Sequence, residues 1–135
     1  MTNSHYDSKT KRFICCDLGG IVLVYDMHKV IPDIKQRFET TNKTGIRGLH
    51  FDETNNFLFT GSIDNGDICV FNIDLIGKET TAQAIITMRS KTQVRVVTWS
   101  SIRKELYTGH EDGTVTIWNC LNQKPICKFF SLKIT

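Results

Sequence analysis

Proline is scarce in this sequence, with two residues among 135. Long apolar runs are also lacking, since none approaches the roughly 20 residues that a membrane-spanning helix needs. Residues 1–11 are polar throughout, so we expect no secretory signal peptide. A dominant charge is also lacking, because 17 Lys and Arg oppose 14 Asp and Glu for a net charge of +3. Nucleic-acid-binding domains usually present a basic face or stripe, whereas here the strongest basic cluster is the short run 9–12. These absences argue against a membrane span and against nucleic acid as the partner.

Cysteine pairs at metal-ligand spacing are lacking as well. The five cysteines are an odd number, no C-x-x-C pair occurs, and no histidine is placed to complete a zinc site. Ser62 follows Gly61, but the G-x-S-x-G turn of a hydrolase nucleophile is absent. We therefore expect no cofactor, no metal and no enzyme activity. Reduced cysteines favour a cytoplasmic protein, with the nucleus as the alternative.

The histidines do not form a recognisable catalytic group. His50 alternates within an apolar run, which is typical of a packed strand residue rather than of a general base. His110 stands beside Glu111 and Asp112, and we expect a solvated hairpin turn there rather than a metal site. The remaining two, His5 and His28, are predicted to lie in loops without partners.

A glycine-led strand occurs three times, at residues 20–26, 66–72 and 113–119. Each copy begins with glycine, continues with alternating β-branched residues and ends with an aromatic residue followed by Asp or Asn. The copies are 46 and 47 residues apart, a period typical of stacked structural repeats. Because glycine tolerates a positive φ, we expect each of these strands to follow a tight hairpin turn.

Further apolar runs complete each unit. The run before each glycine-led strand is 13–16, 57–61 or 106–109, and a third run precedes it at 46–51 and 94–99. The aromatic residues of these third runs, Phe51 and Trp99, each lie seven positions before a leucine of the next run, Leu58 or Leu106. Seven positions before Phe13, in the first unit, the sequence also has an aromatic residue, Tyr6. Fourth strands are predicted at 35–40, 84–89 and 124–130. Each unit is therefore predicted to be a four-stranded antiparallel meander.

Four strands per unit of this length, ending in an aromatic residue and Asp or Asn, are typical of β-propeller blades. On these residues the chain resembles the WD-repeat family, and Trp118-Asn119 is nearest to the Trp-Asp ending of that family. Residues 46–127 are most similar to repeats of propellers that also contain a zinc-binding FYVE module, which does not occur in this sequence. The resemblance implies an all-β fold with three four-stranded antiparallel blades. They are expected at about 1–40, 41–89 and 90–135 of a single partial propeller, residues 1–135.

The sequence departs from the family pattern at the residues that join the strands of a blade. In the family a Gly-His pair usually opens the innermost strand, and the corresponding positions here hold Asn42 and Ser90. The family's turn Asp is matched by Asp112, less closely by Asp64, and by Gly19 in the first unit. The resemblance therefore implies an incomplete hydrogen-bond relay within the blades.

Three blades would form an open arc rather than a closed ring, because known rings use roughly four to eight blades. A bare face of about 400 Å² forfeits on the order of 10 kcal/mol, comparable with the stability of a whole domain. We therefore expect the missing blades to come from a longer chain, from a second copy in a two-fold six-bladed ring, or from another protein. The residues expected on the bare faces are Ile21, Leu23 and Tyr25 at one end, and Val97, Trp99, Val115 and Ile117 at the other.

The resemblance implies a non-catalytic protein-interaction scaffold that binds other proteins through loops on a rigid frame. Arg47 and Arg95 occupy equivalent positions, and arginine is enriched at interface hot spots. Pairing of both arginines with acidic residues of adjacent blades is the alternative. A rival function is purely structural, in which the chain donates its blades to another chain's ring or to a two-fold dimer. The candidate partner-binding residues are Arg47, Arg95, Asp17, Asn42, Asp64, Ser90, His110 and Asp112.

Overall fold

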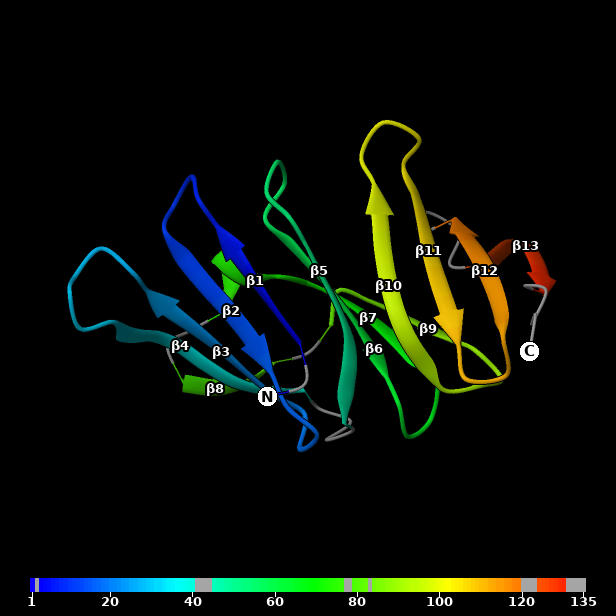
Figure 1. The fold of residues 1–135 in the computed structure, drawn as a ribbon, viewed down its shortest axis with the longest axis horizontal. Coiled ribbons are helices and arrows are strands. Elements are labelled where there is room, and N and C mark those ends of the chain that lie inside the picture. The colour runs from blue at the N-terminus through cyan, green and yellow to red at the C-terminus, as the bar shows by residue number, and fades with distance from the viewer. Residues whose placement is uncertain (2, 41–44, 77–78, 83, 120–123, 131–135) are drawn as a thin grey trace, which may run out of the picture.

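The computed structural model describes residues 1, 3–40, 45–76, 79–82, 84–119 and 124–130. In this part of the chain the strands form three sheets that lie side by side, and Figure 1 shows the first and third at opposite ends of the molecule. The described residues contain no α-helix and one short 3-10 helix, η1 (Ile73–Leu75). The prediction of an all-β fold built from propeller-type blades in an open arc is confirmed.

The three sheets repeat one plan, in which consecutive strands are antiparallel neighbours. The first sheet has the order β1-β2-β3-β4-β8, the second β5-β6-β7-β9 and the third β10-β11-β12-β13. The first consists of β1 (Asn3–Asp7), β2 (Arg12–Cys16), β3 (Ile21–Asp26), β4 (Asp33–Thr40) and β8 (Glu79–Ala82). The second consists of β5 (Ile46–Asp52), β6 (Phe57–Ser62), β7 (Asp67–Asn72) and β9 (Ile86–Arg89). The third consists of β10 (Val94–Ser100), β11 (Glu105–His110), β12 (Thr114–Asn119) and β13 (Lys124–Phe130).

The offset of seven residues corresponds to direct cross-strand pairing. Tyr6 lies opposite Phe13 in the first sheet, and Trp99 lies opposite Leu106 in the third. In the second sheet the corresponding pair is Phe51 and Leu58. The same register therefore recurs at the same hairpin of each sheet.

The repeated glycines have the conformation that the sequence predicts. The φ angles are 81° at Gly20, 75° at Gly66 and 85° at Gly113, each in the turn before the third strand of its sheet. A second positive φ recurs in the turn before the second strand, at Lys11, Asn56 and Lys104. Lysine gives no sequence signal for this conformation, so this second repeat was not predicted.

Strand β8 has no counterpart among the predicted strands. It pairs in parallel with β4, for example Arg37 with Glu79, and extends the first sheet to five strands. By position it falls within residues 41–89, the range expected for the second blade. A segment between β7 and β9 thus joins the edge of the neighbouring sheet, which ties the first two sheets together through the backbone.

The core is divided into two layers between adjacent sheets. Between the first and second sheets, Phe38 and Phe71 are buried with their ring centroids 5.7 Å apart. Between the second and third sheets, the rings of Phe59 and Trp99 stack at 5.0 Å. The second sheet therefore contributes alternate residues of its strands to both layers, whereas the first and third sheets each face one layer.

The expectation that Val97 and Trp99 lie on the bare end face is wrong. Val97 is 4% exposed, and both residues pack in the layer against the second sheet. The register of β10 shifts between Val94 and Val96, which is a β-bulge at Arg95. The bulge adds one residue to the strand, so the side chains after it lie on the opposite faces from those that strict alternation from Val94 gives. Val96, 56% exposed, faces away from the core instead.

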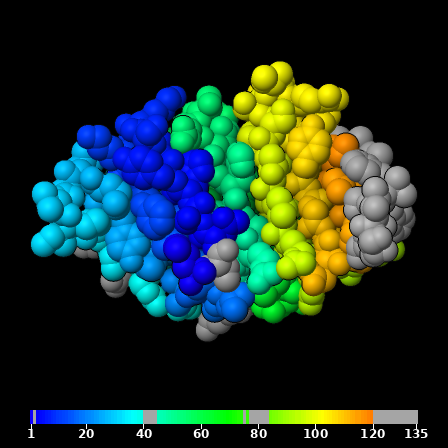
Figure 2. All heavy atoms as spheres, in the orientation of Figure 1, coloured from blue at the N-terminus to red at the C-terminus, as the bar shows by residue number. Residues whose placement is uncertain are grey.

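The other residues expected on the end faces are only partly covered. At the first sheet, Ile21, Leu23 and Tyr25 keep intermediate exposure, and at the third sheet Val115 and Ile117 do the same. No further sheet covers either face within the described part of the chain. Figure 2 shows the third sheet and the first at opposite ends of the space-filling surface.

Candidate functional site

Three hairpin turns lie at one end of the molecule, which we call the hairpin end: β2–β3, β6–β7 and β11–β12 (Figure 1). Their aspartates first stabilise the turns themselves. Oδ1 of Asp17 accepts hydrogen bonds from the N–H groups of Gly19 at 2.9 Å and Ile21 at 3.0 Å. Oδ1 of Asp112 accepts from the N–H of Thr114 at 3.0 Å. Short turns held in this way give the loop residues fixed positions.

The turns are also connected to the strands beside them. Oδ2 of Asp64 accepts a hydrogen bond of 2.6 Å from the N–H of Gly45, directly before β5. The carbonyl of Asp17 accepts a hydrogen bond of 3.0 Å from the N–H of Ile46, which joins the first sheet to the second. Asp17 therefore lies at the contact between the first two sheets, apart from the cleft described next.

A cleft of about 460 Å³ lies at the hairpin end between the second and third sheets. It is formed by the turn of β6–β7, the segment between β9 and β10, and the turn of β11–β12. Two of the predicted partner-binding residues, Asp64 and Asp112, line it together. The other residues lining the cleft are Asn65, Lys91, Thr92, Gln93 and Glu111. They lie between the predicted strands, in loops expected at 62–65, 90–93 and 110–112. They were not singled out, because the sequence does not show which loops meet.

A second cavity of about 290 Å³ lies on the other side of the segment between β9 and β10. Lys91 and Thr92 contribute to both spaces, and this cavity extends inward to Trp118. The side chain of Ser90 holds the segment in place, because its Oγ accepts a hydrogen bond of 3.2 Å from the N–H of Thr92. Ser90 therefore lines this second cavity and fixes the segment that also borders the cleft.

His110 does not lie in a solvated turn, and that prediction is wrong. It is the last residue of β11 and 6% exposed. Its Nε2 lies 2.8 Å from Oγ1 of Thr108, which accepts a hydrogen bond of 2.8 Å from Nε1 of Trp118. Its Nδ1 lies 3.3 Å from Oγ of Ser90. The third sheet therefore contains a continuous relay, with His110 on β11 supplying the imidazole that the sequence lacks at Ser90.

Arg47 and Arg95 are equivalent in the structure as the sequence predicts. Each is the extra residue of a β-bulge at the start of an innermost strand, because the register shifts between Ile46 and Gly48 and between Val94 and Val96. Nε of Arg95 lies 3.0 Å from Oε2 of Glu111, and both side chains are about half exposed. Its acidic partner is thus in the same sheet rather than in an adjacent one.

The side chain of Arg47 forms no ion pair with any other residue that the structure describes. Its backbone carbonyl accepts a hydrogen bond of 3.0 Å from the amide of Asn3, which joins the first and second sheets. Asn42 lies outside the described residues. Arg95 thus lies beside the cleft, because its partner Glu111 lines the cleft. Arg47 lies at the contact of the first two sheets.

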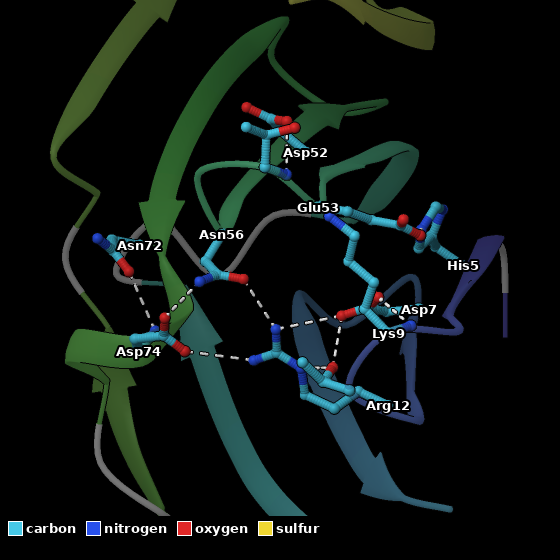
Figure 3. A network of polar contacts seen from close by, with 11 residues as sticks. His5, Asp7, Lys9, Arg12, Asp52, Glu53, Asn56, Asn72 and Asp74 are labelled. Atoms are coloured by element: carbon cyan, nitrogen blue, oxygen red, sulfur yellow. Dashed lines mark hydrogen bonds and ion pairs between the residues drawn. The ribbon is translucent and has the colours of Figure 1, made fainter.

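A buried polar network lies at the opposite end of the molecule, where sequence reasoning expected only a basic run. Arg12 is 4% exposed, and its Nη2 donates to Oδ2 of Asp7 at 3.3 Å and to Oδ1 of Asn56 at 3.0 Å (Figure 3). Its Nη1 donates to Oδ1 of Asp74 at 3.3 Å. Because Asn56 and Asp74 belong to the second sheet and its following segment, one guanidinium joins the first two sheets.

This network sets the ionisation of Asp7, which is 1% exposed. Burial by itself raises the pKa of Asp7, but hydrogen bonds from the Thr10 hydroxyl, the N–H of Lys9 and Arg12 outweigh it, and the pKa lies below 3.8. The carboxylate therefore remains charged in the folded state beside its guanidinium partner.

The two histidines nearest to this network differ from each other in surroundings. His50 is half-buried in β5 with its ring 6.3 Å from that of Phe59, as predicted for a packed strand residue. Burial lowers its pKa, and the neighbouring His5 lowers it further. His5 lies in β1, 3.1 Å from Glu53, so the prediction of a loop position without a partner is wrong. His28 does lie in a loop, after β3, but it has a partner, because its Nδ1 is 2.6 Å from Oδ1 of Asp26.

Within the described ranges, no group of three or more His, Cys, Asp or Glu side chains is arranged to hold a metal ion. Cys15, Cys16 and Cys69 are buried free thiols, and burial raises the pKa of Cys15 and of Cys69. In the same ranges no helix has the length and apolar character needed to cross a membrane.

Comparison with known proteins identifies the repeat. The family model for the WD domain, G-beta repeat, matches residues 34–72 and 83–119, more than half of the chain. Each match runs from the outer strand of one sheet through the first three strands of the next, which is β4 to β7 and then β9 to β12. No curated protein matches the chain. Proteins with these repeats are generally non-catalytic scaffolds that bind other proteins, and this chain belongs to the WD-repeat family.

Proposed function

We propose that this chain is a non-catalytic protein-interaction scaffold that binds a partner protein at the hairpin end, in the cleft between the second and third sheets. The observation that supports this most is the meeting of three loops at one cleft of about 460 Å³, with Asp64 and Asp112 on its walls. The loops belong to hydrogen-bonded sheets, so the cleft is held open without the partner. A prearranged surface loses less entropy when it binds.

The charges at the cleft fit a polar partner surface. Lys91 lines the cleft together with three acidic residues, Asp64, Glu111 and Asp112, and Arg95 pairs with Glu111. The exposed ion pair of Arg95 and Glu111 contributes about 0–1 kcal/mol to stability, so these two side chains can exchange partners at little cost. We propose Arg95 as a binding residue for this reason. We propose Arg47 as a second one because it occupies the equivalent position in the second sheet and its side chain forms no ion pair with any described residue.

We also propose that the chain works with further blades. Supporting this are the partly exposed apolar residues on the two end faces, among them Leu23 and Ile117. The blades are supplied by the rest of a longer chain, by a second copy or by another protein. Buried free thiols at Cys15, Cys16 and Cys69 support a location in the cytoplasm or the nucleus.

The alternative function is that of a blade donor, for which the contact surface is an end face instead of the cleft. The apolar face of the first sheet favours it, since Tyr6 is 49% exposed and the rings of Phe13 and Tyr25 are 6.3 Å apart on the same face. Contiguous exposed apolar surface of this kind marks an interaction site. The two functions therefore use different surfaces: the scaffold binds its partner at the cleft, whereas the blade donor packs against other blades through an end face.

Site-specific photo-crosslinking distinguishes the two. A benzophenone amino acid replaces Lys91 in the cleft, Leu23 on the end face, or Lys29, which is 68% exposed and serves as a matched loop control. We expect Lys91 but not Lys29 to crosslink a partner protein, with a yield that falls as salt rises. Crosslinks from Leu23 alone, insensitive to salt, would support the blade donor and contradict the scaffold.

A paired substitution tests the arginines. Arg47→Ala with Arg95→Ala is expected to weaken capture of the crosslinked partner while leaving the melting temperature unchanged, because neither guanidinium has a buried ion-pair partner among the described residues. Arg37→Ala, on an outer strand and 44% exposed, is the control. A marked loss of stability with unchanged capture would mean that both arginines are structural.

A further inference from the structure

An apolar cavity of about 270 Å³ opens between the second and third sheets at the end opposite the cleft. Phe57, Phe59, Val70 and Ile86 line it from the second sheet, and Trp99 and Lys104 line it from the third. Strand β10 separates the two ends, and its seven residues span about 20 Å. The cavity is therefore distinct from the proposed partner cleft.

A polar atom in its wall lacks a partner. Nε1 of Trp99 is buried and makes no hydrogen bond with any residue that the structure describes. The indole N–H is a donor only, and buried donors are nearly always paired in folded proteins. The other tryptophan illustrates the usual arrangement, because Nε1 of Trp118 donates to Thr108 at 2.8 Å. This N–H has almost no accessible surface, so Trp99 offers an occupant its apolar ring rather than its donor.

The mouth of the cavity is cationic. Lys104 is exposed, and no acidic side chain among the described residues pairs with it. It is held in the turn between β10 and β11 with a φ of 54°. This turn projects from the surface (Figures 1 and 2) and also carries Ile102, which is 93% exposed. The cavity thus combines an apolar interior with a positive charge at its edge.

We propose that this cavity binds a peptide segment of a partner protein, in which an aliphatic side chain enters the cavity and an adjacent carboxylate pairs with Lys104. The anchoring side chain packs against the ring of Trp99, which lines the cavity. A cavity of about 150 Å³ already holds benzene, so about 270 Å³ has room for an aliphatic side chain.

The test uses the full chain and the peptide acetyl-Asp-Leu-Asp-amide, which offers a carboxylate on either side of the anchor. The chain has two tryptophans, so their two indole N–H signals are resolved by NMR with ¹⁵N labelling and assigned with Trp99→Phe. We expect the peptide to shift the signal of Trp99. The signal of Trp118, whose N–H is already bonded, should stay in place.

Matched variants and peptides test each part of the proposal. Lys104→Glu should weaken binding about fivefold or more, the upper range for an exposed ion pair. Lys11→Glu should leave binding unchanged, because Lys11 has the equivalent turn conformation in the first sheet, away from the cavity. Acetyl-Asn-Leu-Asn-amide and acetyl-Asp-Ala-Asp-amide should bind more weakly than the parent peptide.

Three results would overturn the proposal. The first is a Trp99 signal that does not move at millimolar peptide. The second is equal binding by the peptide without carboxylates or by the peptide without the leucine. The third is equal weakening by Lys104→Glu and Lys11→Glu. None of these results bears on the cleft at the hairpin end, which the peptide does not occupy.

Discussion

Arg12→Ala is expected to destabilise the protein more than any exposed substitution. The guanidinium is 4% exposed and is the cationic partner of Asp7, which is 1% exposed. Removal of one partner of a buried ion pair leaves an uncompensated charge and costs about 3–5 kcal/mol. The same substitution also removes the hydrogen bonds to Asn56 and Asp74 that join the first two sheets.

Urea unfolding followed by circular dichroism measures this loss. Arg37→Ala is the control, because its partner Glu39 is 3.8 Å away and its side chain is 44% exposed, so we expect a loss of about 1 kcal/mol or less. The double variant Arg12→Met with Asp7→Asn should recover part of the stability, since no buried charge then remains unpaired. A loss below about 1 kcal/mol in Arg12→Ala would refute the reasoning.

The remaining predictions concern the relay, the sheet contacts and the pH dependence. Thr108→Val should cost about 1–3 kcal/mol in urea unfolding because it leaves the indole of the relay unpaired, whereas the exposed Thr98→Val should be nearly neutral. Gly61→Ala should cost about 1–3 kcal/mol, because its Cβ would lie 2.4 Å from a valine of β10, whereas Gly109→Ala, with its nearest atom at 3.7 Å, should not. Because the pKa of His50 is lowered in the folded state, the unfolded state binds more protons below about pH 6.5. The free energy of unfolding should therefore fall as the pH drops through this range, and His50→Gln should make it depend less steeply on pH.

Much of the fold could be predicted because its signals are local. Glycine at 20, 66 and 113 indicates a positive φ directly, and the structure has it at each position. The seven-residue offset gave the register of the first hairpin, as Tyr6 opposite Phe13 shows. Strand β8 gave no such signal, since its pairing with β4 depends on a strand about 40 residues earlier in the chain.

The contents of the site were less predictable because they depend on contacts between distant residues. Arg12 looked like part of a basic surface run, yet its partners Asn56 and Asp74 are 44 and 62 residues away. His110 looked like a turn residue beside two acids, yet its position at the end of β11 directs it to Ser90. The loops of the cleft were predicted correctly as loops, and only the packing of the sheets shows that they meet.

The most direct test of the proposed need for further blades is the native mass of the 135-residue chain by sedimentation velocity, with its thermal unfolding recorded on the same sample. Two partly exposed end faces predict a species heavier than one chain, either a defined dimer or larger assemblies. A single compact monomer that melts cooperatively would contradict the account, because an open arc with bare faces would then be stable alone.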